Sequence, residues 1–278
     1  MVGVLRWMTA LARLERRGPG RTDATRREGR IGGRRAGTAR VGRGPCGILA
    51  RTMSVGDLLY TAHVPGGEGP FPTLILIHGW GANAHDLLGL APMVHEGRAL
   101  VLCPQGPVVV PIGGGERGYG WFPLNPGQPP DPGEFRHGAA LLRRFVEQAR
   151  SRYPVDPQAV VVGGFSQGGT MAFDLALRDP ADYSGLVGLS TWLPAPLDDD
   201  LPRLPAQEGM PVLLMHGTSD PLIDIERARE SREALRRFGV AITYRELDMG
   251  HEIRPEALRV LLRWLEERGF KRRGADAG

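Results

Sequence analysis

Ser166, Asp220 and His251 are the side chains whose types and order suit nucleophilic catalysis. Ser166 lies in a Gly164-x-Ser166-x-Gly168 pattern, between a β-branched run and a helical pattern. This arrangement is typical of a sharp strand-to-helix turn that exposes a serine hydroxyl above a sheet edge. Taken alone, the pattern also fits a glycine-rich turn that merely contains a serine. A serine hydroxyl is a weak nucleophile, so it needs a nearby base and a group that orients that base.

The candidate bases are the two histidines that follow Ser166 in the chain, His216 and His251. His216 lies within an apolar run that is predicted to be a strand, and it precedes any plausible orienting carboxylate. His251 lies in a loop between the last predicted strand and the last predicted helix. His251 is therefore the better candidate, in the order serine, acid, histidine that α/β-hydrolases use.

The candidate acid is Asp220, which lies in the loop directly after the predicted strand 211–216. Two other carboxylates compete with it. Asp224 is better explained as the N-cap of the following helix. Asp248 is too close in sequence to His251 for the expected strand separation. The sequence therefore predicts that Asp220 orients His251.

Two backbone amides are candidates to stabilise an oxyanion. Trp80 lies in the glycine-containing loop after the predicted strand 73–78, and Gln167 directly follows the serine. In hydrolases of this layout these two places supply the N–H donors of the oxyanion hole. A helix that begins at Gln167 also directs the positive end of its dipole to the same spot.

Strand-like and helix-like segments alternate along the chain. Strands are expected over 58–64, 73–78, 99–104, 160–162, 183–190, 211–216 and 241–247, and helices over 85–95, 134–153, 167–178, 225–238 and 255–268. The alternation predicts an α/β fold with a mostly parallel central sheet and helices on both faces. The connection 191–210 is too short to form a large cap.

The stretch 105–132 is rich in glycine and proline and is predicted to be a long structureless loop. Loops of this length are usually functional. Its aromatic pair, Trp121 and Phe122, would either line a substrate pocket or pin the loop to the body of the protein.

Charge is distributed unevenly along the chain. Residues 1–51 contain thirteen arginines and three acidic residues, so this part carries a net charge of +10 and the rest −6, out of a total of +4. We expect residues 1–52 to be a disordered Arg/Gly-rich extension, 53–270 to form the hydrolase domain, and 271–278 to be a flexible tail. The extension would be a dispensable segment before a working start at Met53, an arm that binds nucleic acid or anionic membrane, or a targeting peptide.

Composition excludes several other classes. The two cysteines, Cys46 and Cys103, form neither a disulfide framework nor a zinc motif, so no metal site is predicted. No apolar run approaches the roughly 20 residues needed to span a bilayer. We therefore expect a cytoplasmic protein without a membrane span or a nucleic-acid partner.

The segments HGWGANAHDL, GFSQGG, STWLP, HGTSDPLI and GHEI resemble the phospholipase/carboxylesterase family of α/β-hydrolases, which includes acyl-protein thioesterases. The resemblance covers roughly residues 58–269 and implies the α/β-hydrolase fold. It implies Ser166 as nucleophile, Asp220 as orienting acid, His251 as base, and Trp80 and Gln167 as oxyanion donors. The GAN sequence at 81–83 resembles the bacterial carboxylesterase branch.

The resemblance implies a serine esterase that acts on a small-molecule ester through an acyl-enzyme, without a cofactor. A lysophospholipase or acyl thioesterase on the same triad is an alternative, as is a catalytically silent binding protein of this fold. The sequence does not indicate the oligomeric state.

Overall fold

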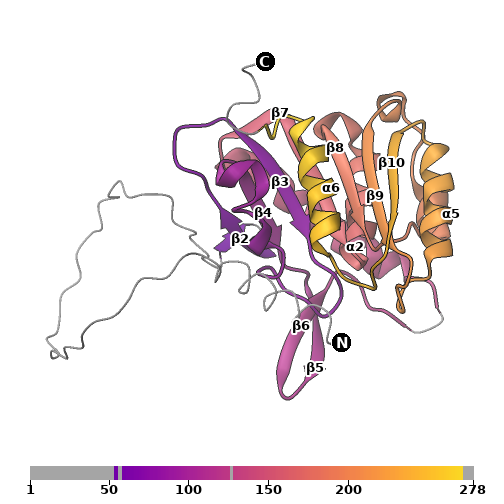
Figure 1. Ribbon diagram of the computed structural model, residues 1–278. Coiled ribbons are helices and arrows are strands. Elements are labelled where there is room, and N and C mark those ends of the chain that lie inside the picture. Colours follow the sequence, from indigo (N-terminus) through magenta and orange to yellow (C-terminus); the bar gives the residue numbers. More distant parts are fainter. Residues whose placement is uncertain (1–52, 56–57, 126–127, 272–278) are drawn as a thin grey trace, which may run out of the picture.

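The computed structural model describes residues 53–55, 58–125 and 128–271 (Figure 1). The predictions for the extension 1–52, for Cys46 and for the tail beyond residue 271 lie outside the described residues. Cys103 is buried in a strand, and its thiol is free.

A single eight-stranded sheet organises the described part of the chain, in the order β1-β2-β4-β3-β7-β8-β9-β10. From β4 to β10 all neighbours are parallel, and β1 and β2 add an antiparallel edge. The strands are β1 (Met53–Val55), β2 (Leu58–His63), β3 (Phe71–Ile77), β4 (Leu100–Pro104), β7 (Val155–Phe165), β8 (Gly185–Leu189), β9 (Pro211–Gly217) and β10 (Ala241–Leu247). The expected α/β-hydrolase architecture is confirmed.

Helices cover both faces of this sheet (Figure 1). Alternate residues of a strand point to opposite faces, and β3 shows the result: Ile75 and Ile77 join one core, Leu74 and Leu76 the other. The first core includes residues of α2 (Pro132–Arg152), α3 (Gln167–Arg178) and α5 (Ile225–Arg236), and the second includes residues of α6 (Pro255–Glu266). The central strands are continuous apolar runs because both faces are buried.

The predicted helix 85–95 is wrong. The chain forms two 3₁₀ turns instead, η1 (Leu88–Leu90) and η2 (Val94–Gly97). Pro92 has no N–H with which to continue an α-helical ladder. His95 and Glu96 adopt left-handed backbone angles, with φ of 51° and 56°, which no α-helix contains.

The prediction that 105–132 is structureless is also wrong. It contains a β-hairpin, β5 (Val108–Gly113) and β6 (Glu116–Gly120), that extends away from the central sheet (Figure 1). Gly113, Gly114 and Gly115 have φ of 95°, 60° and 80°, so the glycines that suggested a loop form the hairpin turn.

Trp121 and Phe122 pin this segment to the body rather than line a pocket. Their side chains are 1% and 0% exposed. The Trp121 indole donates a hydrogen bond to the carbonyl oxygen of His78 at 2.9 Å, and the Phe122 ring packs against Phe135 of α2.

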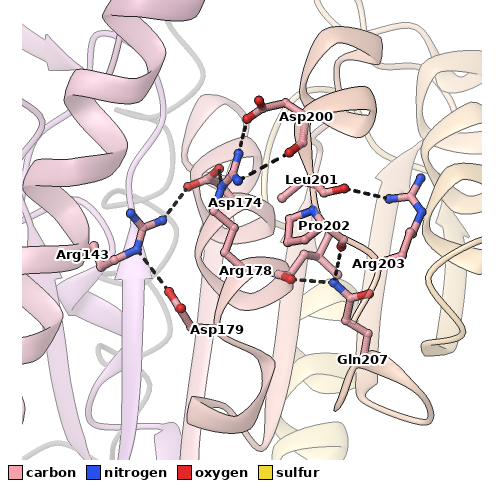
Figure 2. A network of polar contacts seen from close by, with 10 residues as sticks. Arg143, Asp174, Arg178, Asp179, Asp200, Leu201, Pro202, Arg203 and Gln207 are labelled. Atoms are coloured by element: carbon pink, nitrogen blue, oxygen red, sulfur yellow. Dashed lines mark hydrogen bonds and ion pairs between the residues drawn. The ribbon is translucent and has the colours of Figure 1, made fainter. Parts of the chain in front are cut away.

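The connection between β8 and β9 contains only the short α4 (Ala195–Asp200) and the turn η4 (Pro205–Gln207), so it forms no large cap. An ionic network links α4 to α3 and α2 (Figure 2). The buried Asp174 of α3 pairs with Arg143 of α2 at 3.3 Å and with Arg178 at 2.7 Å. Arg178 in turn pairs with Asp200 at the end of α4. The network therefore links α2, α3 and α4.

Within the described residues, no helix is long and apolar enough to cross a membrane. The same residues include no group of three or more His, Cys, Asp or Glu side chains arranged to hold a metal ion.

Candidate active site

The turn at Ser166 joins β7 to α3 in a strained conformation. Ser166 has φ 54° and ψ −123°, a region that costs a non-glycine residue about 1–3 kcal/mol. A Cβ on Gly164 would lie 2.1 Å from the carbonyl oxygen of Gly168, and one on Gly168 would lie 2.1 Å from that of Ile77. Both glycines of the motif are therefore required by backbone packing. The predicted strand–turn–helix is confirmed.

The strained turn is held from the neighbouring strand. The Ser166 N–H donates to the carbonyl oxygen of Leu189 at 2.9 Å. The Thr191 hydroxyl donates to the carbonyl oxygen of Ser166 at 2.7 Å. These bonds to residues at and beyond the end of β8 stabilise a backbone conformation that Ser166 would not adopt alone.

Asp220 and His251 are brought together although they are far apart in the sequence. His251 Nδ1 lies 2.8 Å from Asp220 Oδ2. Their loops follow the adjacent parallel strands β9 and β10, and the Ser219 N–H donates to the carbonyl oxygen of Met249. Since a carboxylate only accepts, Nδ1 carries the hydrogen. Nε2 of the neutral imidazole is then free to accept a proton.

The Asp220 carboxylate is fully buried and fully engaged. Its Oδ1 accepts hydrogen bonds from the N–H groups of Leu222 and Ile223, at 2.9 and 3.0 Å. Burial would raise the pKa of this carboxyl, but the hydrogen bonds from His251 and from these two amides outweigh it, and the pKa of Asp220 is lowered. The group is therefore held as an anion at neutral pH. Asp224 instead caps α5 through the Glu226 N–H, as expected.

His251 lies against the Ser166 turn. Its ring packs on Phe165, with the ring centroids 4.8 Å apart, and Phe165 directly precedes the serine. The loop after β3 approaches from the other side, since a Cβ on Gly79 would lie 3.2 Å from the Ser166 Cβ. The serine, the histidine and this loop therefore share one place at the carboxyl edge of the sheet.

The two predicted oxyanion donors both border this place. Trp80 follows Gly79, and its ring covers the backbone of Gly120 so closely that a Cβ there would lie 2.3 Å away. Gln167 is the first residue of α3, where an N–H has no acceptor within the helix. Its side chain is used elsewhere, since Oε1 accepts from the Trp121 N–H. The oxyanion role of both amides stays a prediction.

Sequence reasoning missed His78 as a residue that holds this loop. Its side chain is buried, and Nε2 accepts a hydrogen bond from the Gly106 N–H at 3.0 Å. Nδ1 lies 2.8 Å from the carbonyl oxygen of Gly79. Burial lowers the pKa of His78 to about 4, so the imidazole is neutral and donates to Gly79. The signal available in the sequence was a histidine at a strand end directly before a glycine.

The family model described as Phospholipase/Carboxylesterase matches residues 62–268. The chain belongs to the phospholipase/carboxylesterase family. Acyl-protein thioesterase 1 of Gibberella zeae is 31% identical over 206 residues, which cover 67% of this chain and 86% of that protein. Acyl-protein thioesterase 1 of Mycosarcoma maydis is 30% identical over 121 residues, 41% of this chain and 50% of that protein.

Solved structures show the same fold. The crystal structure of esterase PE8 superimposes with a TM-score of 0.63 at 23% identity, over 76% of this chain and 99% of that one. The Bacillus cereus carboxylesterase gives a TM-score of 0.63 at 22% identity, over 76% and 95%. Membership of the phospholipase/carboxylesterase family makes this chain a serine hydrolase of ester or thioester bonds.

Proposed function

We propose that this protein is a carboxylesterase in which Ser166 is the nucleophile, His251 the base and Asp220 the acid that orients His251. The observation that carries the proposal is the partly buried hydrogen bond between Asp220 and His251. The His251 ring also packs on Phe165, directly before the strained Ser166 turn. A structural role alone would not need a partly exposed serine held in a strained turn next to an oriented imidazole.

The proposed reaction uses only groups of the chain and water. His251 Nε2 removes the Ser166 proton while Oγ attacks the ester carbonyl carbon. The N–H groups of Trp80 and Gln167 hold the resulting oxyanion. The intermediate collapses to an acyl-serine and releases the alcohol, which takes the proton from His251. Water then attacks the acyl-serine in the same way, releases the carboxylic acid and restores Ser166. No step requires a metal or cofactor.

A thioester substrate is the second candidate. The 31% identity to a protein named acyl-protein thioesterase 1 favours it, and the same triad would release a thiol in place of an alcohol. A small-molecule ester substrate, a cytoplasmic location and the absence of a nucleic-acid partner stay predictions.

Hydrolysis of paired substrates tests both candidates. The full chain would be assayed on 4-nitrophenyl esters of increasing acyl length and on small-thiol thioesters of the same acyl groups. Ser166→Ala should lose turnover of both classes. Ser151→Ala, which removes a hydroxyl bonded only to its own helix, should behave as wild type. A higher kcat/KM on the esters supports a carboxylesterase, and a higher value on the thioesters favours the second candidate.

Folded wild-type protein that hydrolyses neither class, or Ser166→Ala protein that keeps its activity, would overturn the proposal. A lysophospholipid substrate included in the same series decides the remaining alternative on this triad.

A further inference from the structure

His216, at the end of β9, contacts the acid of the proposed triad. The side chain is fully buried, and its Nε2 lies 2.8 Å from the carbonyl oxygen of Ile223 and 3.4 Å from Asp220 Oδ2. Both neighbours of Nε2 are oxygen acceptors. Nε2 must therefore carry a hydrogen, which it donates to the Ile223 carbonyl oxygen, while Asp220 Oδ2 lies at contact distance.

Three N–H groups donate hydrogen bonds to the Asp220 carboxylate, and a fourth, that of His216 Nε2, lies beside it at 3.4 Å. Oδ1 accepts from the amides of Leu222 and Ile223, while Oδ2 accepts from His251 Nδ1–H and is approached by His216 Nε2–H. The carboxylate has no exposed surface, so water does not replace a donor that is removed. Each donor therefore matters for the charge and orientation of Asp220.

His216 also closes the loop that carries Asp220. Ile223 donates its N–H to Asp220 and accepts the His216 hydrogen at its carbonyl oxygen. Both backbone polar groups of Ile223, the last residue of the 220–223 turn, are therefore hydrogen-bonded. One bond comes from the catalytic carboxylate and the other from the strand before the turn.

A purely packing role does not explain a histidine at this position. The preceding residues of β9, Leu214 and Met215, are apolar and fully buried. Nδ1 of His216 is buried, and no hydrogen-bond partner for it occurs among the residues that the structure describes. A buried imidazole with one unsatisfied nitrogen costs free energy that a leucine would not. The compensation lies in the two contacts of Nε2.

We propose that His216 is a positioning residue: its Nε2–H holds the 220–223 turn through Ile223, and so keeps the Asp220 carboxylate in the orientation from which Oδ2 receives the His251 Nδ1–H. The proposal rests on the proposed function, because it takes His251 to be the base. His216 does not touch the substrate. It acts through Asp220.

Two amide substitutions in the full chain separate this role from simple packing. His216→Gln places an N–H near the position of Nε2, whereas the shorter His216→Asn reaches only the position of Nδ1. We expect His216→Asn to lower kcat about tenfold to a hundredfold, the range for a buried acceptor, here the Ile223 carbonyl oxygen, that is left without its hydrogen bond. KM should change less than about twofold. His216→Gln should restore most of the lost kcat.

His63→Asn is the matched control. His63 is also buried on a strand, and its Nε2 lies 2.8 Å from the carbonyl oxygen of Gly97, but it belongs to β2 and not to the triad loops. This variant should lose stability and keep kcat. Titration with a fluorophosphonate, which labels the reactive serine, gives the concentration of active enzyme in each sample. Each kcat is calculated with that concentration.

Proton and ¹⁵N-histidine NMR of the wild type gives a measurement that needs no variant to fold. His216 should appear as the Nε2–H tautomer, and the His251 Nδ1–H should give a low-field resonance that shifts in His216→Asn and returns in His216→Gln. An Nδ1–H tautomer for His216 would overturn the proposal. Equal kcat in His216→Asn and wild type would do the same, as would an equal loss of kcat in His63→Asn.

A failure of the His216 proposal can be distinguished from a failure of the proposed function. If wild type and Ser166→Ala show no difference on any ester or thioester, the catalytic assignment fails, while the NMR comparison still reports whether His216 orients the Asp220–His251 pair. If Ser166→Ala is inactive and His216→Asn is fully active, only the role of His216 is refuted.

Discussion

Asp220→Asn is the most informative single substitution, because the structure determines which way the new amide must face. Oδ1 accepts two backbone N–H groups, from Leu222 and Ile223. An asparagine oxygen satisfies both, while an NH₂ group at that position would oppose two donors. The oxygen therefore takes the place of Oδ1, and the NH₂ group takes the place of Oδ2, 2.8 Å from His251 Nδ1.

A donor at that position reverses the tautomer of His251. Nδ1 must then accept, so the hydrogen moves to Nε2, and Nε2 can no longer take the Ser166 proton. The loss expected for the wrong tautomer is about 10⁴-fold in kcat, or about 5.5 kcal/mol at 1.36 kcal/mol per tenfold change in rate. The shape and volume of the buried side chain barely change, so the variant should fold.

The assay is ester hydrolysis by wild type, Asp220→Asn and the control Asp224→Asn. Asp224 caps α5 through its side-chain oxygen, and asparagine is an equally good N-cap. We expect Asp224→Asn to keep wild-type kcat. An Asp220→Asn enzyme that retains more than about a tenth of wild-type kcat would refute the assignment of Asp220 as the group that sets the His251 tautomer.

Three further predictions follow from contacts in and around the site. Gly168→Ala places a Cβ 2.1 Å from the last carbonyl oxygen of β3, so it should lower the free energy of unfolding by about 1–3 kcal/mol in a urea titration and reduce kcat in the ester assay. Gly66→Ala is the control, because its Cβ meets nothing within 4 Å, and it should change neither quantity. The lowered pKa of Asp220 contributes stability that is present above the unfolded-state value of about 3.9 and is lost as the pH falls through the folded-state value. The stability difference between wild type and Asp220→Asn should therefore shrink in urea titrations below about pH 4, and a constant difference would contradict the shift. Trp121→Phe removes the bond to the His78 carbonyl oxygen in a buried place, so thermal unfolding should show a loss of about 1–3 kcal/mol, and an unchanged melting temperature would argue against that bond.

The sequence predicted the fold well where burial dictates residue type. A strand covered on both faces must be apolar throughout, so the runs 73–78 and 211–216 identify buried strands without any tertiary information. The order of Ser166, Asp220 and His251 predicted that these residues meet, since each lies at or just after a strand end, and parallel strands place those ends at one edge.

The errors arose where local signals have two explanations. The segment 85–95 has the apolar spacing of a helix, but Pro92 and the left-handed angles at His95 and Glu96 break it. The glycines at 113–115 indicate a turn, and only the pairing of Val108–Val110 with the strand beyond them shows that the turn closes a hairpin. The same limit applies to His216, which was set aside as a base because it lies in an apolar strand run and precedes any plausible orienting carboxylate. Its contact with Asp220 depends on how the 220–223 loop folds back, which the sequence does not show.

The distances in the site depend on residues that have no chemistry of their own. The loops that carry the proposed triad meet backbone to backbone. A Cβ on Gly217 would lie 2.2 Å from the carbonyl oxygen of Met249, between the Asp220 and His251 loops. Gly168 meets β3 in the same way, beside the serine and the Trp80 loop. A side chain at either glycine would push two loops apart and lengthen the Asp220–His251 bond or move the serine from the proposed oxyanion donors. Close backbone contact, which only glycine permits at these junctions, therefore sets the distances among the proposed triad residues.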